Sequence, residues 1–238
     1  RRHIDVQILE GASEDPNQMD VLLVAARKEL VNEYQSLISQ AGLKPAVVDV
    51  DAFAVANTFE LNYDVPEDTI ALINIGASNV NIHILRNGVS AFTRDVGIGG
   101  RQFTEEIQRT LNISYEEAEA MKVGGDEHDA AAVVPEEIER VLASVGQNLA
   151  TEIQRSLDFY LSTSADAGIS RIYLSGGAAK TPGLSRSISQ QTGLPTEVVD
   201  PFRRIQIDER AFNPAFLHDV APQAAVVVGL AVRRPGDK

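Results

Sequence analysis

The sequence contains no cysteine, and this absence excludes several kinds of chemistry. A disulfide framework, a thiolate metal site and a cysteine nucleophile all require thiol groups. The 4 histidines, at positions 3, 83, 128 and 218, do not have the spacing of metal ligands, so we propose no zinc site. A reducing cytosol is the simplest setting for such a chain.

Basic residues and long apolar runs are also scarce. The chain has 21 Lys and Arg against 34 Asp and Glu, a net charge of −13. Non-specific binding of nucleic acids or anionic lipids uses clustered Lys and Arg, whereas this chain has only short basic pairs such as Arg203-Arg204. Its longest apolar runs, at 21–26 and 224–231, are far shorter than the roughly 20 residues of a membrane helix. We therefore expect no nucleic-acid partner and no direct membrane insertion.

The hydrophobic pattern predicts a small α/β unit at the start of the chain. Alternating or continuous apolar residues predict strands at 4–8, 21–26 and 45–50. Between the last two, a helix stopped by Gly42 has an apolar face of Leu30, Tyr34, Leu37, Ile38 and Ala41. Asp51 is expected to be the N-cap of a following helix.

A second region begins with a predicted meander of strands at 70–75, 80–85 and 89–96, the last two joined by the hairpin signal Asn87-Gly88. Ser114 has capping-box spacing and opens a helix that ends at Gly124-Gly125, before a surface loop at 126–134.

The remaining pattern completes an α/β protein. Pro135 opens a long helix whose apolar stripe is Ile138, Val141, Leu142, Val145, Leu149, Ile153, Leu157 and Tyr160. Strands follow at 172–174 and 196–199, with a helix between them that ends at Gly193, and Pro222 opens a last helix. This alternation of hairpins and crossover helices is typical of the α/β class.

Two glycine-containing turns are candidate sites. Residues 74–79, Asn-Ile-Gly-Ala-Ser-Asn, form a turn between strands whose backbone N–H groups suit phosphate oxygens, although an ordinary hairpin turn has the same pattern. Residues 174–179, Leu-Ser-Gly-Gly-Ala-Ala, connect a strand to a helix. A flat ring such as adenine could lie against Gly176 and Gly177, although a plain βα turn also explains them.

Three further features complete the search for chemistry. Glu119 and Lys122 are spaced i, i+3 and could reach ribose hydroxyls or phosphate, or form an exposed ion pair. The segment 97–100, Gly-Ile-Gly-Gly, lacks the third glycine of a dinucleotide fingerprint and follows a hairpin, so we reject a Rossmann fold. Ser175 lies outside a Gly-x-Ser-x-Gly elbow, which argues against a serine hydrolase.

In their order along the chain, these motifs resemble the actin-like ATPase superfamily. Its second domain has a phosphate turn between strands, a Gly-Gly-x-x-Phe helix start, an Ala-Glu-x-x-Lys helix and a Gly-Gly adenosine loop. The corresponding segments are 74–79, 99–103, 118–122 and 174–178, the last followed by Pro182-Gly183-Leu184.

Within this superfamily the sequence is most similar to the FtsA-like PilM family of type IV pilus assembly, through residues 20–29 with 41–45 and 48–53, residues 71–78, and residues 92–100. The resemblance implies an inserted small subdomain at 1–50, a helix and linker at 51–67 that return to the first domain, and the complete second domain at 68–238, with a helical subdomain at about 97–160. It also implies that the first domain starts well before Arg1. Because the chain opens on Arg1-Arg2-His3 without Met, we expect an N-terminally truncated chain.

The resemblance also implies ligands and partners. PilM-like proteins bind ATP, with Mg²⁺, between two domains, and they bind the N-terminal cytoplasmic peptide of the inner-membrane protein PilN. We therefore expect a cytoplasmic ATP-binding scaffold, peripheral to the inner membrane through a PilN-like partner, with other platform components or further copies of the chain as additional partners. By the same resemblance the nucleotide contacts are Asn74, Gly76, Ala77, Ser78, Asn79, Glu119, Lys122, Gly176, Gly177 and Ala178.

The phosphate turn departs from the superfamily pattern, which usually begins with Asp and continues Gly-Gly-Thr. Here these positions are Asn74, Ala77, Ser78 and Asn79. Because an amide does not supply the negative charge that attracts Mg²⁺, we predict nucleotide binding with slow or absent hydrolysis, and we name no catalytic residue. The alternatives are an active ATPase or kinase of the superfamily and an FtsA-like cell-division filament protein. The tail at 233–238 has no apolar face, so we do not expect an FtsA-type membrane tether.

Overall fold

The computed structural model describes residues 2–9, 19–64, 67–123, 136–164, 168–208 and 210–237. The chain divides into two compact units, one formed by Arg1–Val50 with Leu230–Lys238 and the other by Asp51–Gly229. We describe each unit by itself.

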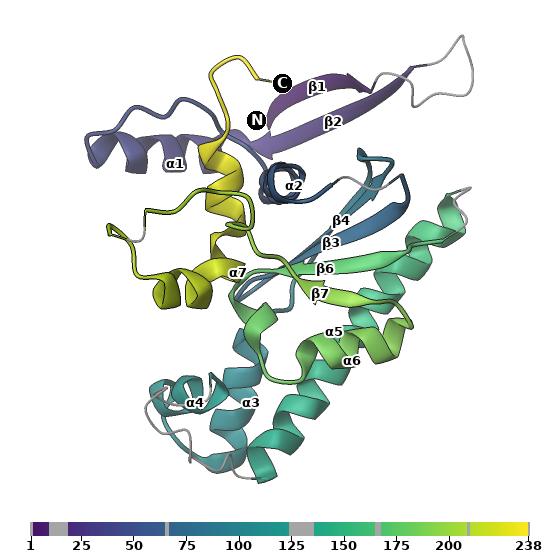
Figure 1. The fold of residues 1–238 in the computed structure, drawn as a ribbon, viewed down its shortest axis with the longest axis vertical. Helices are drawn as coiled ribbons and strands as arrows, with labels where there is room; N and C mark the ends of the chain where they lie inside the picture. Colours follow the sequence, from purple (N-terminus) through teal and green to yellow (C-terminus); the bar gives the residue numbers. More distant parts are fainter. Residues whose placement is uncertain are drawn as a thin grey trace. The chain divides into compact units, whose positions relative to one another are not determined.

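The first unit contains a two-stranded antiparallel ribbon and one helix (Figure 1). Strand β1 (Arg2–Leu9) pairs with β2 (Asp20–Arg27), and α1 (Lys28–Gln40) follows directly. The register aligns the apolar residues of the two strands on one face of the ribbon, which is formed by Ile4, Val6, Ile8, Val21, Leu23 and Ala25. These side chains are exposed, and so is the predicted apolar face of α1, from which no residue is buried.

The prediction of a strand at 45–50 is wrong. This segment has no strand conformation and pairs with no strand in the described part of the chain. Its alternating Val48 and Val50 remain exposed, whereas Asp49 forms an ion pair with Arg233, at 3.2 Å between Oδ2 and Nε. An apolar alternation makes a strand only where a neighbour supplies hydrogen bonds to its backbone.

The second unit is built on a five-stranded mixed sheet in the order β5-β4-β3-β6-β7 (Figure 1). The meander of β3 (Thr69–Ile75), β4 (Val80–Arg86) and β5 (Val89–Val96) is antiparallel. On the other side of β3, β6 (Arg171–Ser175) and β7 (Thr196–Val198) add in parallel. Asn87 and Gly88 have positive φ of 52° and 78°, as the predicted two-residue hairpin turn requires.

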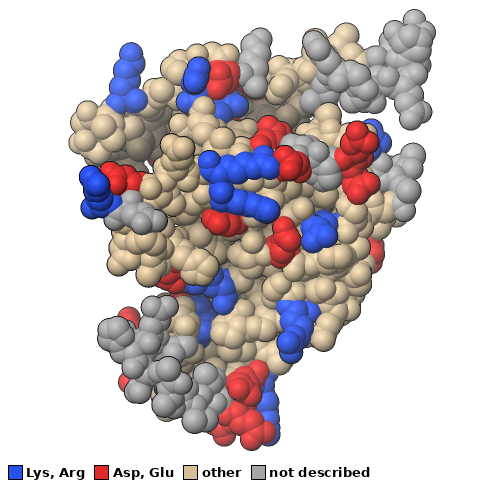
Figure 2. Space-filling view, viewed as in Figure 1, with Lys and Arg blue, Asp and Glu red and all other residues tan. Residues whose placement is uncertain are grey.

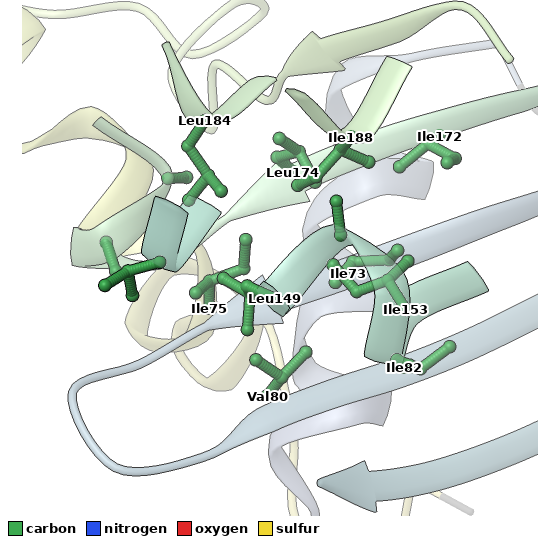
Figure 3. Packing of buried hydrophobic residues seen from close by; sticks show 14 of the residues in the cluster. Ile73, Ile75, Val80, Ile82, Leu149, Ile153, Ile172, Leu174, Leu184 and Ile188 are labelled. Atoms are coloured by element: carbon green, nitrogen blue, oxygen red, sulfur yellow. The ribbon is translucent and has the colours of Figure 1, made fainter. Parts of the chain in front are cut away.

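One face of this sheet is covered by α5 (Glu136–Thr163) and α6 (Leu184–Thr192), while α3 (Arg101–Leu111) packs on α5 and α4 (Tyr115–Lys122) packs on α3. Figure 3 shows this core, in which Ile73, Ile75, Val80 and Ile82 of the meander meet Leu149 and Ile153 of α5. The predicted stripe of the long helix is buried along its whole length, and the predicted Ser114 capping box is present. Both predictions are therefore confirmed.

The opposite face of the sheet is covered by α2 (Asp51–Asn62) and α7 (Pro214–Ala231). Val55 and Phe59 of α2 and Ala225 of α7 pack with Ile70, Leu72 and Leu85 of the sheet. The two helices approach closely, because the Thr58 hydroxyl donates to the Ala225 carbonyl oxygen at 2.5 Å and a Cβ on Gly229 would overlap the carbonyl oxygen of Ala54.

Two helix starts differ from the predictions. The last helix begins at Pro214, with the Asn213 side chain accepting from the Ala215 N–H at 2.9 Å, so Pro222 lies inside the helix instead of opening it. Asp51, predicted as the N-cap, is instead the first helical residue of α2. The predictions for Gly124-Gly125, the loop at 126–134 and Pro135 fall outside the described residues.

Because it begins earlier, α7 is also longer than the apolar run at 224–231. Within the described residues it is one helix whose length and composition would allow a membrane crossing, with a mean hydropathy of 1.2 and 22% of this stretch buried.

The charges on the surface are mixed, since Figure 2 shows Lys and Arg interspersed with Asp and Glu over the viewed face.

Candidate functional site

Three loops of the second unit meet at the carboxyl ends of β3 and β6. The first is the turn after β3, in which the Gly76 N–H donates to the Asn79 carbonyl oxygen at 2.9 Å. The second loop is the segment between β5 and α3, which is hydrogen-bonded to this turn. The N–H groups of Gly100 and Arg101 donate to the carbonyl oxygens of Gly76 and Ala77, at 2.9 and 2.8 Å. The predicted phosphate turn is therefore attached directly to the helix start that follows β5.

Glycine is required where these loops touch. A Cβ on Gly99 would lie 2.5 Å from the Gly76 carbonyl oxygen and 2.7 Å from that of Ala77, distances that Cβ atoms do not adopt. A Cβ on Gly100 would lie 2.7 Å from the Cβ of Ala178 in the third loop. The Gly-Gly pair thus lets the β5–α3 segment fit between the other two loops.

The third loop runs from the end of β6 into a short 3₁₀ helix, η1 (Gly177–Lys180). Gly176 has φ of 88°, and its N–H donates to the carbonyl oxygen of Pro222 in α7 at 2.7 Å. A Cβ at this position would overlap the Ile75 carbonyl oxygen, so Gly176 is buried against β3. Gly177, in contrast, is exposed and lies against the Gln223 side chain.

The turn after β3 offers unpaired backbone donors. Ala77, Ser78 and Asn79 are exposed, and within the described residues the N–H groups of Ala77 and Ser78 donate no hydrogen bond. Successive free N–H groups in a tight turn form a concave binding surface for an anion. The turn therefore has the free donors that the predicted phosphate contact requires.

A row of polar side chains crosses the sheet beside this turn. The strand register places Ser175, Asn74, Asn81 and Asp95 next to one another on β6, β3, β4 and β5. The Ser175 hydroxyl donates to Asn74 Oδ1 at 3.3 Å, Asn74 Nδ2 donates to Asn81 Oδ1 at 3.2 Å, and Asn81 Nδ2 donates to Asp95 Oδ1 at 2.7 Å. Asn74 is thus held from both sides.

Glu119 and Lys122 form a different cluster. Lys122 is buried, and its Nζ lies 2.7 Å from a Glu119 carboxylate oxygen and 3.1 Å from the Thr104 hydroxyl of α3, which itself donates to Glu119 at 2.5 Å. Burial opposes the charge of Glu119, but the hydrogen bonds from Lys122 and Thr104 hold its pKa below the usual value. Glu119 and Lys122 thus form a partly buried ion pair at the contact between α3 and α4, and not a fully exposed one.

The structure brings together most of the predicted site residues. Asn74, Gly76 and Ala77 contact the β5–α3 segment or the Gly176 loop, and Ala178 contacts Gly100. Glu119 and Lys122 form no hydrogen bond with these loops within the described residues, although Thr104 lies one turn beyond the start of α3.

The predicted site residues do not include Asn81, Asp95 and Thr104, which belong to the same hydrogen-bond networks. For Asn81 a signal exists, because counting outward from the predicted turn places it opposite Asn74 in the hairpin. Asp95 and Thr104 depend on strand register and helix packing that the pattern alone does not reveal.

The loops suit a nucleotide better than a bound Mg²⁺. Free N–H groups and an open glycine surface are what a phosphate and a flat base require, and both are present. For Mg²⁺ the turn itself supplies amide and hydroxyl oxygens but no carboxylate, and the described residues contain no group of three His, Asp or Glu side chains able to hold a metal. The loops therefore fit a nucleotide, and the turn supplies no carboxylate of its own to a metal ion.

Two curated proteins are similar to this chain in sequence. The chain is 26% identical over 156 residues to the ethanolamine utilization protein EutJ of Escherichia coli (strain K12), a match that covers 66% of this chain and 48% of that protein. It is 28% identical over 124 residues to the cell division protein FtsA of Bacillus subtilis (strain 168), which covers 48% of this chain and 28% of FtsA. Matches to these curated relatives thus span about half of their length or less.

A solved structure matches almost the whole chain. The structure described as "PilM-PilN type IV pilus biogenesis complex" superposes with a TM-score of 0.81 and 28% sequence identity. The match covers 98% of this chain and 66% of the chain in that structure. The converging loops and these neighbours define the actin-like ATPase fold, which confirms the predicted fold class.

A family model described as "Type IV pilus assembly protein PilM" matches residues 2–235. The chain therefore belongs to the PilM family of type IV pilus assembly proteins, as its sequence motifs predicted.

Proposed function

We propose that this chain is part of a cytoplasmic ATP-binding scaffold of the type IV pilus inner-membrane platform. The observation that carries the proposal is the convergence of the 76–79 turn, the Gly99-Gly100 segment and the Gly176-Gly177 loop at one edge of the sheet. In this arrangement the N–H groups of Ala77 and Ser78 face the phosphates, and the base lies against Gly177.

The remaining contacts of the proposed site come from side chains. Asn74, Ser78 and Asn79 surround the phosphates, while Glu119 and Lys122 approach the ribose or phosphates from the joint with α3. We assign no general base and no metal-binding carboxylate in these loops, so binding proceeds with slow or absent hydrolysis. The nucleotide then acts by stabilising one conformation of the protein.

The proposed partner is a PilN-like inner-membrane protein, which supplies its N-terminal cytoplasmic peptide. The support is the 28% identity to a PilM in a PilM–PilN complex over 98% of this chain. Such a partner would hold the protein at the inner membrane without inserting it, and other platform components or further copies of the chain would complete the assembly.

A titration with fluorescent ATP on the full-length protein tests the nucleotide site. We expect binding by the wild type and by Gly97→Ala, because a Cβ on Gly97 would meet no atom within 4 Å. Gly99→Ala forces a Cβ into the backbone of the phosphate turn and should weaken binding at least tenfold. Equal affinities for the two variants would contradict the assignment of the site.

Fluorescence polarisation of a labelled PilN-type N-terminal peptide tests the partner. We expect the full-length protein to bind the peptide, and we compare this chain alone in parallel, each with and without ATP and Mg²⁺. Failure of the full-length protein to bind in every condition would leave the actin-like fold intact and favour an active ATPase or kinase instead.

A further inference from the structure

The polar row across β6, β3, β4 and β5 has a fixed direction, and this direction decides what Asn74 presents to a ligand. Asp95 ends the row, and a carboxylate only accepts hydrogen bonds, so Asn81 must turn its Nδ2 toward it. The Oδ1 of Asn81 then faces Asn74, which must donate through its own Nδ2. The Oδ1 of Asn74 is left to accept from Ser175.

This arrangement leaves Asn74 with a spare donor. Its amide has two N–H groups, and within the described residues the row uses one of them. Its Oδ1 is taken by Ser175 and lies against Gly176, where a Cβ would be 2.6 Å away. Asn74 is only partly buried, so its second N–H remains available beside the exposed turn.

The superfamily pattern of an aspartate at this position would offer the opposite chemistry. A carboxylate at 74 would only accept, so its approach to a phosphate would need a cation between them. It would also conflict with the row, because Asn81 Oδ1, directed away from Asp95, would then face another acceptor at position 74.

We propose that Asp95, acting through Asn81, is a positioning residue that makes Asn74 a direct hydrogen-bond donor to a nucleotide phosphate, so that nucleotide binding does not depend on Mg²⁺. This inference rests on the proposed nucleotide function. It extends that function by naming the ligand form, a metal-free nucleoside triphosphate, and two residues outside the turn, Asn81 and Asp95, that select it.

The test compares fluorescent ATP binding by the full-length protein in Mg²⁺ and in EDTA. We expect wild-type dissociation constants within about threefold of each other, because the site donates to phosphate directly. For Asn74→Asp we expect affinity to fall at least tenfold in EDTA and to recover in Mg²⁺, since a cation would then bridge the two negative groups. Asp95→Asn should weaken binding several-fold in both buffers.

The control for Asp95→Asn is Asp68→Asn, which removes the same charge from an exposed residue at the other end of β3 and should leave both affinities unchanged. A second readout needs no ligand: Asp95→Asn should shift the side-chain amide resonances of both Asn81 and Asn74. A shift confined to Asn81 would show that the row is not coupled and would overturn the proposal.

The binding outcomes separate this proposal from the function on which it rests. Wild-type binding that requires Mg²⁺ would overturn the role of the row and leave the nucleotide site in place. Absence of wild-type binding in both buffers would overturn the nucleotide function and the role of the row together.

Discussion

Single residues decide both the chemistry and the packing of this protein. Position 74 has an amide, whereas the pattern of the actin-like superfamily has a carboxylate there. The hydrogen bonds of Asn74 to Asn81 and Ser175 use both its Nδ2 and its Oδ1. At 99, 100 and 176 the lack of a side chain lets three loops touch through their backbones. Exchanging one functional group or adding one methyl group would therefore change the site that we propose for a nucleotide.

His83 is a buried residue that the proposed function does not use. It lies on β4, where its Nδ1 is 3.0 Å from the Ala52 carbonyl oxygen and its Nε2 is 2.9 Å from the Ser90 hydroxyl. Burial lowers the pKa of His83 from its usual 6.5 to about 4, although the hydrogen bond to Ala52 acts in the opposite direction. The imidazole is therefore neutral at pH 7, with Nδ1 donating to Ala52.

This histidine makes folding stability depend on pH. Between pH 6.5 and 4 the unfolded chain binds a proton that the folded chain does not, so the free energy of unfolding should fall as pH decreases through this window. The loss from His83 alone should reach roughly 3 kcal/mol at pH 4 relative to pH 7.

Urea unfolding at several pH values and an NMR titration measure this effect. We expect His83→Asn to remove most of the histidine-dependent slope, whereas the same substitution at the exposed His218 should retain it. A His83 resonance that titrates near pH 6.5 would contradict this account.

At the scale of elements, one glycine shapes the contact between α2 and α7. Gly229 faces Ala54, and the Thr58–Ala225 hydrogen bond lies one turn further along. Small residues at such a crossing let two helix backbones approach without leaving a cavity.

Gly229→Ala tests this pairing. The new methyl group would overlap the Ala54 carbonyl oxygen, so the helices must separate, and we expect the free energy of unfolding to fall by about 1–3 kcal/mol or more. The exposed Val227 lies on the same helix, and Val227→Ala should change stability by less than about 0.5 kcal/mol. Thermal or urea unfolding distinguishes the two, and equal losses would show that the crossing is not tight.

At the scale of the whole molecule, the two units differ in how much apolar surface they bury. The second unit has helices on both faces of its sheet and two buried clusters, whereas the ribbon of the first unit keeps Ile4, Val6 and Leu23 exposed. Local stability follows the buried apolar contacts that support each hydrogen bond.

Hydrogen exchange measures this difference directly. We expect the amides of β3, which pairs on both sides and is buried almost throughout, to exchange at least a hundredfold more slowly than those of β1 and β2 in the isolated chain. Similar protection in the ribbon would show that its apolar face is covered in solution.

The sequence by itself determined the elements with strong local signals and the family. The Asn87-Gly88 turn, the Ser114 cap and the stripe of α5 were all predicted, because dihedral preference, side-chain capping and helical period act between residues near in the chain. The ordered motifs identified the actin-like fold and the PilM family in the same way.

Only the tertiary structure decided which residues meet. The segment at 45–50 alternates like a strand but has no strand partner, and Pro222 lies inside a helix that Pro214 begins. The row from Ser175 to Asp95 joins residues on four strands, and the Thr104 contact with Glu119 joins two helices. Such contacts depend on register and packing between distant segments, which local preferences do not encode.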